Sequence, residues 1–205
     1  KEYIQAKEFQ IGDKKLYLEK LGKSVKIKGL NLISNLTKLI SDNSFFNALI
    51  FTYHLNKNKP YIIYNVSHDG SETHPVLKDY SAQNNQNEAI AGKPHTDLFI
   101  HKLRCFVALK DVDQNNGATI YYDKSHKSKL LKKTHMNLFL NKFDFDSDPN
   151  NTDYISNEIL QELEKNYQKK HLVCNKGDLV LIDLKMAHYA VMPKKGSRHL
   201  LWLYY

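Results

Sequence analysis

The sequence predicts a mainly β fold, a jelly-roll or cupin-like barrel with flanking α-helices. Short β-prone segments outnumber helical ones, polar turn residues separate many of them, and one helical segment interrupts the later strands. The chain has 205 residues, of which 41% are hydrophobic, so it can bury one sizeable core and we expect a single domain over 1–205. Residues 1–60 are expected to supply N-terminal strands and supporting helices. Residues 61–205 are expected to form the barrel core, with an insertion near 128–170.

The first part of the chain alternates between strand and helix patterns. Strands are expected at 14–22, 24–30 and 61–67. Residues 31–55 carry helical periodicity and predict two helices that meet near Ser41 and Asp42, either of which suits an N-cap. Residues 68–93 are polar and lack a sustained period, which predicts a long loop of the kind that often forms a lid or a binding loop.

The second part of the chain contains most of the expected barrel strands. These are 94–101, 103–113, 118–123, 170–174, 177–184, 187–192 and 198–205. The sequence QNNG at 114–117 predicts a turn between two of them. Residues 156–170 predict an amphipathic helix that Ser156 can cap. The apolar face of this helix consists of Ile159, Leu160, Leu163 and Tyr167.

The net charge of +8 does not by itself indicate nucleic-acid binding. The lysines are spread along the chain among Asn and Glu residues, whereas a nucleic-acid surface usually gathers its cations in one patch. Only Arg104 and Arg198 are arginines, and arginine is the better reader of base edges. We therefore expect a small-molecule substrate and no nucleic acid. In so lysine-rich a chain, each arginine is also expected to do something that lysine cannot do.

The sequence predicts a cytoplasmic protein without a membrane span. It has no apolar run of about 18 residues, and its first residues lack the apolar centre of a signal peptide. The two cysteines, Cys105 and Cys174, lie within predicted strands and are expected to be buried, reduced thiols. Nothing in the sequence sets an oligomeric state.

The stretch PHTDLFIH at 94–101 places two polar side chains in an apolar strand. His95 and Asp97 are two residues apart and therefore project from the same face. A His-x-Asp triplet alone is a weak signal, but His188 and Arg198 follow in a later strand–turn–strand segment. Two imidazoles and one carboxylate leave three positions of a metal open, which is the arrangement of non-haem Fe(II) oxygenases. Arg198 could bind the distal carboxylate of 2-oxoglutarate through two parallel hydrogen bonds.

Other interpretations of these residues remain open. His95 and Asp97 could form an outward-facing polar pair, His188 could be a core histidine, and Arg198 could lie at the surface of a terminal strand. The same three ligands could instead hold Zn²⁺ in a hydrolase, although Arg198 argues against this. A cupin-like binding module without turnover is the third alternative.

The chain resembles the phytanoyl-CoA dioxygenase family of Fe(II)/2-oxoglutarate-dependent oxygenases over about residues 61–205. The segments that carry the resemblance are HTD (95–97), CFVALKDVDQNNGATIYYDKSHK (105–127), KGDLVLID (176–183), AHYA (187–190) and SRHLLWLYY (197–205). The resemblance implies a double-stranded β-helix and iron held by His95, Asp97 and His188. It also implies that Arg198 binds the distal carboxylate of 2-oxoglutarate.

The same resemblance implies further site residues and a reaction. Phe106 corresponds to an aromatic residue that lines the co-substrate pocket, and Tyr64 is a second candidate for that pocket. The implied reaction uses O₂ to hydroxylate a small organic substrate while 2-oxoglutarate becomes succinate and CO₂. The chain departs from the family in having Asp123-Lys124 where Pro-Gly is usual before Ser-His. It also has Ala190 where a hydroxyl is frequent, which removes one expected hydrogen bond to the co-substrate.

Overall fold

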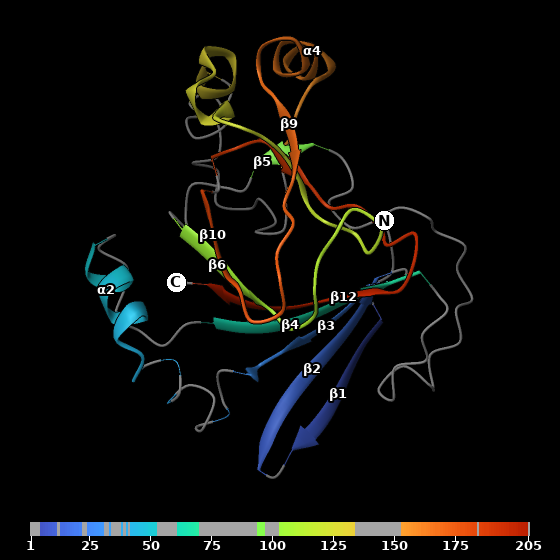
Figure 1. The fold of residues 1–205 in the computed structure, drawn as a ribbon. Coiled ribbons are helices and arrows are strands. Elements are labelled where there is room, and N and C mark those ends of the chain that lie inside the picture. The colour runs from blue at the N-terminus through green and yellow to red at the C-terminus, as the bar shows by residue number, and fades with distance from the viewer. Residues whose placement is uncertain are drawn as a thin grey trace, which may run out of the picture.

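Two antiparallel β-sheets form the framework of the computed structural model (Figure 1). The structure describes residues 5–11, 13–21, 24–30, 33, 38, 40, 42–52, 61–69, 94–96, 103–133, 153–183 and 185–204. The larger sheet has the strand order β1-β2-β3-β4-β12-β6-β10, and the smaller sheet has the order β8-β5-β11-β7-β9. The predicted jelly-roll fold, a double-stranded β-helix with flanking helices, is confirmed.

The strands of the two sheets have the following bounds. In the larger sheet they are β1 (Gln5–Ile11), β2 (Lys14–Leu21), β3 (Ser24–Lys28), β4 (Tyr61–His68), β12 (Ser197–Tyr204), β6 (Leu103–Ala108) and β10 (Leu179–Asp183). In the smaller sheet they are β8 (Asp153–Tyr154), β5 (His95–Thr96), β11 (His188–Tyr189), β7 (Ile120–Tyr122) and β9 (Lys169–His171).

The central strands of the larger sheet carry apolar side chains on both faces. Other parts of the chain pack against each face. One face contributes Phe106, Ala108 and Leu200 to a cluster with residues from the loops between strands, including Val112 and Cys174. We call this the inner face. The other, outer face contributes Ile62, Cys105 and Leu203, which pack with Phe46 of helix α2 (Ser44–Thr52) and with Ile40. Figure 1 shows α2 beside the larger sheet, near its β6 and β10 edge.

Both cysteines are free thiols and are buried, as the sequence predicts. Cys105 lies in the outer cluster with an exposure of 1%, and its burial raises the pKa of the thiol to about 12. Since the thiolate is the reactive form, iodoacetamide at pH 8 should alkylate Cys105 at least about 100-fold more slowly in the native protein than in urea. Peptide mass spectrometry measures both rates. Equal labelling in the two states would show that Cys105 is not enclosed.

The predicted C-terminal helix is confirmed as α4 (Asn157–Asn166). The Ser156 side chain caps it by accepting a hydrogen bond from the Ile159 N–H at 3.4 Å. Ile159 and Leu163 are buried against residues of the smaller sheet and its loops, including Ala187, which directly precedes β11. Figure 1 shows α4 and β9 above the larger sheet, so the helix covers the smaller sheet rather than the larger one.

Several expectations differ from the structure or lie outside the described residues. Helix α2 begins at Ser44, and the capping acceptor is Asn43 Oδ1, which receives the Phe46 N–H at 3.3 Å, rather than Ser41 or Asp42. Strands β1 and β8 were not expected. The loop was expected over 68–93, but His68 still belongs to β4. Residues 70–93 of that loop, most of the acidic segment before β8, and Asp97 lie outside the described residues. No helix in the described part of the chain is long and apolar enough to cross a membrane.

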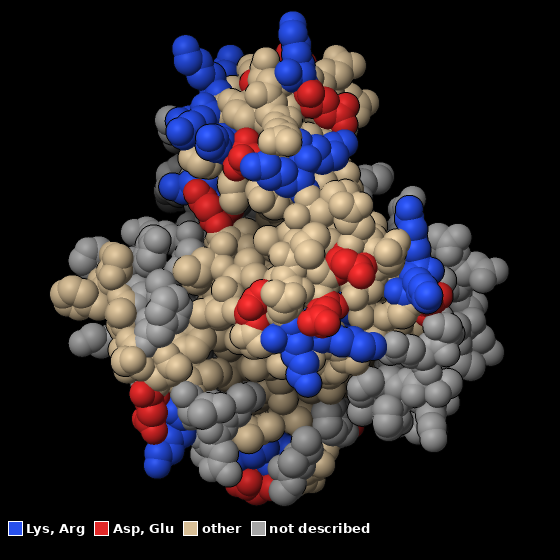
Figure 2. Space-filling model, viewed as in Figure 1, with Lys and Arg blue, Asp and Glu red and all other residues tan. Residues whose placement is uncertain are grey.

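On the face that Figure 2 shows, Lys and Arg side chains have Asp and Glu side chains among them rather than forming one stripe. Lys169 pairs with Glu164 at 3.0 Å, and Lys170 pairs with Asp123 at 2.7 Å. Such partly exposed pairs contribute little to stability, typically about 0–1 kcal/mol.

Candidate functional site

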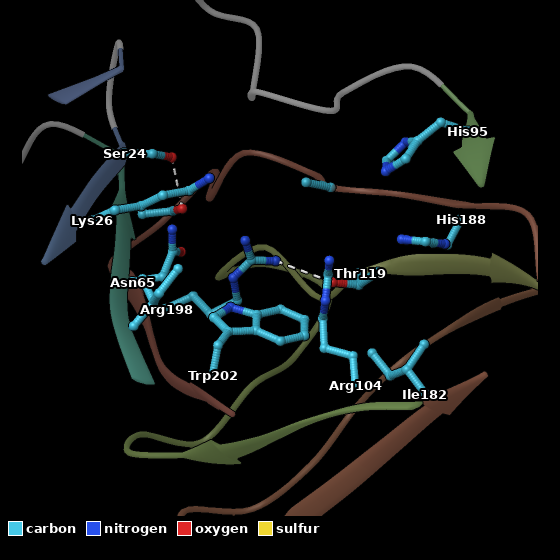
Figure 3. A pocket seen from close by; sticks show the side chains of 13 residues that line it. Ser24, Lys26, Asn65, His95, Arg104, Thr119, Ile182, His188, Arg198 and Trp202 are labelled. Carbon is cyan, nitrogen blue, oxygen red and sulfur yellow. Dashed lines mark hydrogen bonds between the residues drawn. The ribbon is translucent and has the colours of Figure 1, made fainter. Parts of the chain in front are cut away.

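Two histidines lie directly opposite each other on neighbouring strands of the smaller sheet. His95 on β5 pairs with His188 on β11, and their ring centroids are 4.5 Å apart. His95 has an exposure of only 3%. Figure 3 shows both rings at the same end of one pocket. Directly opposed residues in an antiparallel pair bring their side chains together, so both imidazoles can reach one metal ion.

The backbone around His188 fixes the orientation of its ring. His188 Nδ1 donates to the Met186 carbonyl at 2.9 Å, because a carbonyl can only accept. This assigns the proton to Nδ1 and the lone pair to Nε2, which is the arrangement that metal-ligating histidines usually have. The preceding residue, Ala187, is held from both sides. Its N–H donates to Ser125 Oγ at 2.8 Å, and its carbonyl accepts the Tyr122 N–H at 2.9 Å.

The turn that carries Ser125 is built without the usual Pro-Gly pair. Lys124 has φ +63° and is the only non-glycine residue with a positive φ in the described part of the chain. Glycine adopts this left-handed conformation readily, whereas lysine does so at a cost. Asp123 beside it bonds Lys170 of β9, and this hydrogen bond lowers the pKa of the Asp123 carboxyl. The turn that positions Ser125 is therefore formed here by Asp123 and Lys124.

Arg198 lies on the inner face of β12 and is buried, with an exposure of 6%. Its Nη1 donates to the Gly117 carbonyl and to Thr119 Oγ1, the latter at 3.4 Å, while its Nε has no hydrogen-bond partner in the described structure. Burial lowers the pKa of the guanidinium to about 10, so it stays charged at neutral pH. No carboxylate of the described residues forms an ion pair with it. A buried cation of this kind favours an anionic ligand.

The turn at 114–117 is confirmed and supplies the carbonyl that Arg198 contacts. Gly117 has φ +97°, and a Cβ at this position would lie 2.7 Å from the Val191 carbonyl oxygen. Both facts require glycine here. The QNNG turn therefore forms part of the site, because it places the Gly117 carbonyl beside the Arg198 guanidinium.

One pocket between the two sheets brings together three of the predicted site residues, His95, His188 and Arg198 (Figure 3). The predicted third ligand, Asp97, lies outside the described residues. Within those residues no group of three metal-binding side chains occurs. The other residues that line the pocket are Ser24, Lys26, Ile63, Asn65, Ser67, Arg104, Thr119, Ile182, Ala190 and Trp202.

The structure does not place Tyr64 in this pocket. Side chains alternate along β4, and the pocket is lined by its neighbours Ile63 and Asn65, so Tyr64 projects from the outer face. There its hydroxyl is hydrogen-bonded to His199 Nδ1 at 2.7 Å. This corrects the expectation that Tyr64 contributes to the co-substrate pocket.

Phe106 lies on the inner face but is not one of the residues that line the pocket. It packs edge-on against Trp202 with ring centroids 4.9 Å apart, and Trp202 does line the pocket. Its contact with the co-substrate therefore stays a prediction.

Two residues that line the pocket, Thr119 and Arg104, were not among the predicted site residues. Thr119 lies just before β7, and the β11–β7 register continues to place it opposite Ala190. Arg104 lies two residues before Phe106 and so shares its face of β6. The rarity of arginine singles out Arg104, but only the pairing of the strands shows that it enters the same pocket as Arg198.

Comparisons with known proteins indicate a family and a fold for this chain. A family model described as phytanoyl-CoA dioxygenase (PhyH) matches residues 36–192. No match to the sequence is found among curated proteins. The structure of EctD from S. alaskensis with bound Fe is similar, with 13% identity and a TM-score of 0.51. The epimerase SnoN, in complex with Fe3+, alpha ketoglutarate and nogalamycin RO, is similar with 14% identity and a TM-score of 0.55.

The extent of these similarities differs between the two proteins. The match covers 87% of this chain and 55% of EctD. It covers 98% of this chain and 67% of SnoN. This chain therefore spans about half to two thirds of the length of these proteins. At such low identity the likeness is one of fold.

Proposed function

Because the chain belongs to the phytanoyl-CoA dioxygenase family, we propose that it is an Fe(II)- and 2-oxoglutarate-dependent oxygenase that hydroxylates a small organic substrate. The observation that carries this proposal is the buried guanidinium of Arg198 in the same pocket as His95 and His188. A metal site for hydrolysis has no need of such a cation. A 2-oxo acid that chelates the metal and carries a second carboxylate does need one.

The residues present fit the metal and the co-substrate. His95 and His188 would hold Fe(II) together with Asp97, and the Met186 carbonyl supports this role by fixing the ring of His188. Arg198 would bind the distal carboxylate of 2-oxoglutarate. Its Nε, which has no partner in the described structure, is one donor that such a carboxylate could use.

The protein contributes orientation and the exclusion of water. Bound Fe(II) and 2-oxoglutarate supply the oxidising chemistry with O₂, and 2-oxoglutarate is converted to succinate and CO₂. His95 and Arg198 are both buried, so the ends of the co-substrate site are shielded from bulk water. This shielding strengthens the charge-assisted hydrogen bonds of Arg198. It also protects the reactive centre from side reactions.

We assign to Thr119 the hydroxyl that Ala190 lacks. Both residues line the pocket on neighbouring strands, and Thr119 Oγ1 is within 3.4 Å of Arg198 Nη1. A hydroxyl at this place can donate to the carboxylate that Arg198 binds while accepting from the guanidinium. The hydrogen bond would thus come from the adjacent strand instead of from β11.

Thr119→Val should raise the 2-oxoglutarate concentration that gives half-maximal succinate formation by about 2- to 10-fold. The change keeps the shape of the side chain and removes the hydrogen bond from the hydroxyl to the carboxylate. The Arg198 guanidinium still binds that carboxylate, so the cost should stay near that of an ordinary hydrogen bond, about 0.5–1.5 kcal/mol. Thr119→Ser should restore most of the affinity, because it restores the hydroxyl. Titration of 2-oxoglutarate at saturating Fe(II) measures both variants. An unchanged requirement in Thr119→Val would remove Thr119 from the co-substrate site.

Succinate formation separates the proposed oxygenase from its alternatives. The Fe(II)-loaded protein, supplied with 2-oxoglutarate and O₂, should form succinate even without its primary substrate, at the slow rate of uncoupled turnover. A zinc hydrolase would retain Zn²⁺ on purification and form no succinate with any metal. A binding module would bind 2-oxoglutarate without converting it. Metal analysis after anaerobic purification, followed by this assay with metabolite pools, distinguishes the three cases.

A further inference from the structure

One wall of the pocket carries neutral polar side chains in the middle of the larger sheet. Ser24 of β3 and Asn65 and Ser67 of β4 line the cavity, and all three are buried. Asparagine is disfavoured inside strands, and a buried polar group costs free energy unless it is hydrogen-bonded. We propose that these three residues, the Asn65 wall, bind a neutral hydroxyl or amide group of the primary substrate. This inference rests on the proposed function, because it concerns the substrate of that same site.

The side-chain amide of Asn65 has no hydrogen-bond partner in the described part of the chain. Its backbone pairs with Lys26 of β3 and with Leu200 of β12, so the sheet is formed without the amide. Asn65 is only 7% exposed and lines the pocket. The amide offers two N–H donors and a carbonyl acceptor. Since buried polar groups are nearly always hydrogen-bonded in native proteins, these atoms indicate a ligand that both donates and accepts.

The two serine hydroxyls of the wall hold one more donor. Ser24 and Ser67 lie directly opposite each other on β3 and β4, and their Oγ atoms are 2.8 Å apart. One hydroxyl donates its proton to the other, so the second proton has no acceptor among the described residues. An alkyl chain against the wall would leave this proton and the Asn65 amide buried and unpaired, which disfavours an apolar substrate group here. Neither serine nor asparagine carries a charge, so the group that they suit is neutral.

The Asn65 wall lies apart from the place where Arg198 would bind the co-substrate. The Arg198 guanidinium donates to Thr119 Oγ1 at 3.4 Å. Figure 3 shows Ser24 and Asn65 on the other side of this guanidinium from Thr119. The same cavity also contains the two histidines, so a molecule whose polar group lies at the wall can extend to the metal ligands. The wall is therefore available to the primary substrate while 2-oxoglutarate is bound.

Cyclopentanol, cyclopentanecarboxamide and cyclopentane test the wall without knowledge of the substrate. They share one ring and differ in carrying a hydroxyl, an amide or neither. Saturation-transfer NMR measures their dissociation constants for the Fe(II)-loaded protein, saturated with 2-oxoglutarate under anaerobic conditions. Wild type should bind at least one of the two polar probes. Asn65→Leu should weaken this binding about 2- to 10-fold, which corresponds to one neutral hydrogen bond, and should leave cyclopentane binding equal or tighter.

Two further variants and a melting experiment control for the structure of the pocket. Asn157→Leu makes the same change at the exposed first residue of α4 and should leave all three dissociation constants at their wild-type values. Ser24→Ala combined with Ser67→Ala removes both hydroxyls and should also weaken the polar probe. Asn65→Leu should melt at or above the wild-type temperature, because the amide has no partner to lose in the described structure. A lower melting temperature, or equal weakening of all three probes, would make Asn65 a structural residue and overturn the inference.

Titration of 2-oxoglutarate in the same samples keeps this inference distinct from the proposed function. Asn65→Leu should bind iron and 2-oxoglutarate as wild type does. A loss of 2-oxoglutarate affinity in this variant would assign Asn65 to the co-substrate and overturn the inference. Equal binding of the polar probes by wild type and Asn65→Leu, or no binding of either by wild type, would show that water alone occupies the wall. Both outcomes would overturn the inference and leave the proposed function intact, whereas failure of wild type to bind 2-oxoglutarate would reject the proposed function itself.

Discussion

His188→Ala should abolish stoichiometric Fe(II) binding and, with it, succinate formation. His188 supplies one of three expected ligands, and its ring is fixed by the Met186 carbonyl for binding through Nε2. Loss of a residue that only orients a ligand costs about 10- to 100-fold in metal affinity, so loss of the ligand itself should cost more than about 100-fold. Asp97→Ala is expected to have the same effect. Iron content after anaerobic loading and desalting measures both variants.

The matched control for this experiment is His171→Ala. His171 lies exposed on β9, at the far edge of the smaller sheet, so the change removes a histidine without touching the pocket. It should leave iron content and succinate formation at the wild-type level. Full iron occupancy in His188→Ala would reject the ligand assignment. Thermal melting of the variants checks that the sheet itself is preserved.

Arg198→Lys should raise the 2-oxoglutarate requirement by roughly 10- to 150-fold, which corresponds to about 1.5–3 kcal/mol for a hydrogen bond to a charged group. Lysine can supply the charge, but it lacks the planar fork that donates two parallel hydrogen bonds. It also cannot reproduce the contact geometry with Gly117 and Thr119. Fe(II) affinity should stay unchanged, because the metal ligands lie on other strands. Half-saturation by 2-oxoglutarate in the succinate assay measures the effect.

Arg198→Ala should have the larger effect of the two variants, because it leaves the distal carboxylate desolvated and without a cation. It also leaves the buried Gly117 carbonyl without its guanidinium donor, so its melting temperature should fall as well. A 2-oxoglutarate requirement that is unaltered in both variants would remove the co-substrate assignment. The zinc enzyme on the same barrel would then become the better interpretation.

The barrel strands and three of the pocket residues could be predicted from patterns in the sequence. Short β-prone segments between turn residues indicate the strands, and the QNNG turn and the Ser156 cap follow from local backbone chemistry. His188 and Arg198 were found by their spacing from each other and from His95. Antiparallel pairing of neighbouring strands then brings all three to one cavity.

The face of β4 could not be predicted from its sequence. The strand YIIYNVSH is buried on both sides, because α2 and its neighbours cover one face and the smaller sheet covers the other. A strand that is covered on both faces lacks the alternation of apolar and polar residues that distinguishes inside from outside. A shift by one residue exchanges the two faces. Tyr64 was therefore predicted for the pocket, although its neighbours Ile63 and Asn65 enter it.

Strand β8 was missed because long-range pairing defines it. It has two residues, Asp153 and Tyr154, at the end of a polar, acidic segment that has little β propensity. It pairs with β5, where Tyr154 lies opposite His95. The segment expected to form an insertion thus contributes a strand beside His95, one of the proposed metal ligands, and only the tertiary structure reveals this pairing.

Anaerobic calorimetric titration of 2-oxoglutarate into the metal-free and the Fe(II)-loaded protein tests most directly whether this pocket is an iron and 2-oxoglutarate site. One equivalent of 2-oxoglutarate should bind to the Fe(II)-loaded protein, because the metal and Arg198 hold its two ends at once. Binding should be much weaker without Fe(II), since only the contacts of Arg198 and Thr119 then remain. Binding that is equally tight with and without Fe(II), or no binding to the loaded protein, would contradict the assignment of His95, His188 and Arg198 to one site.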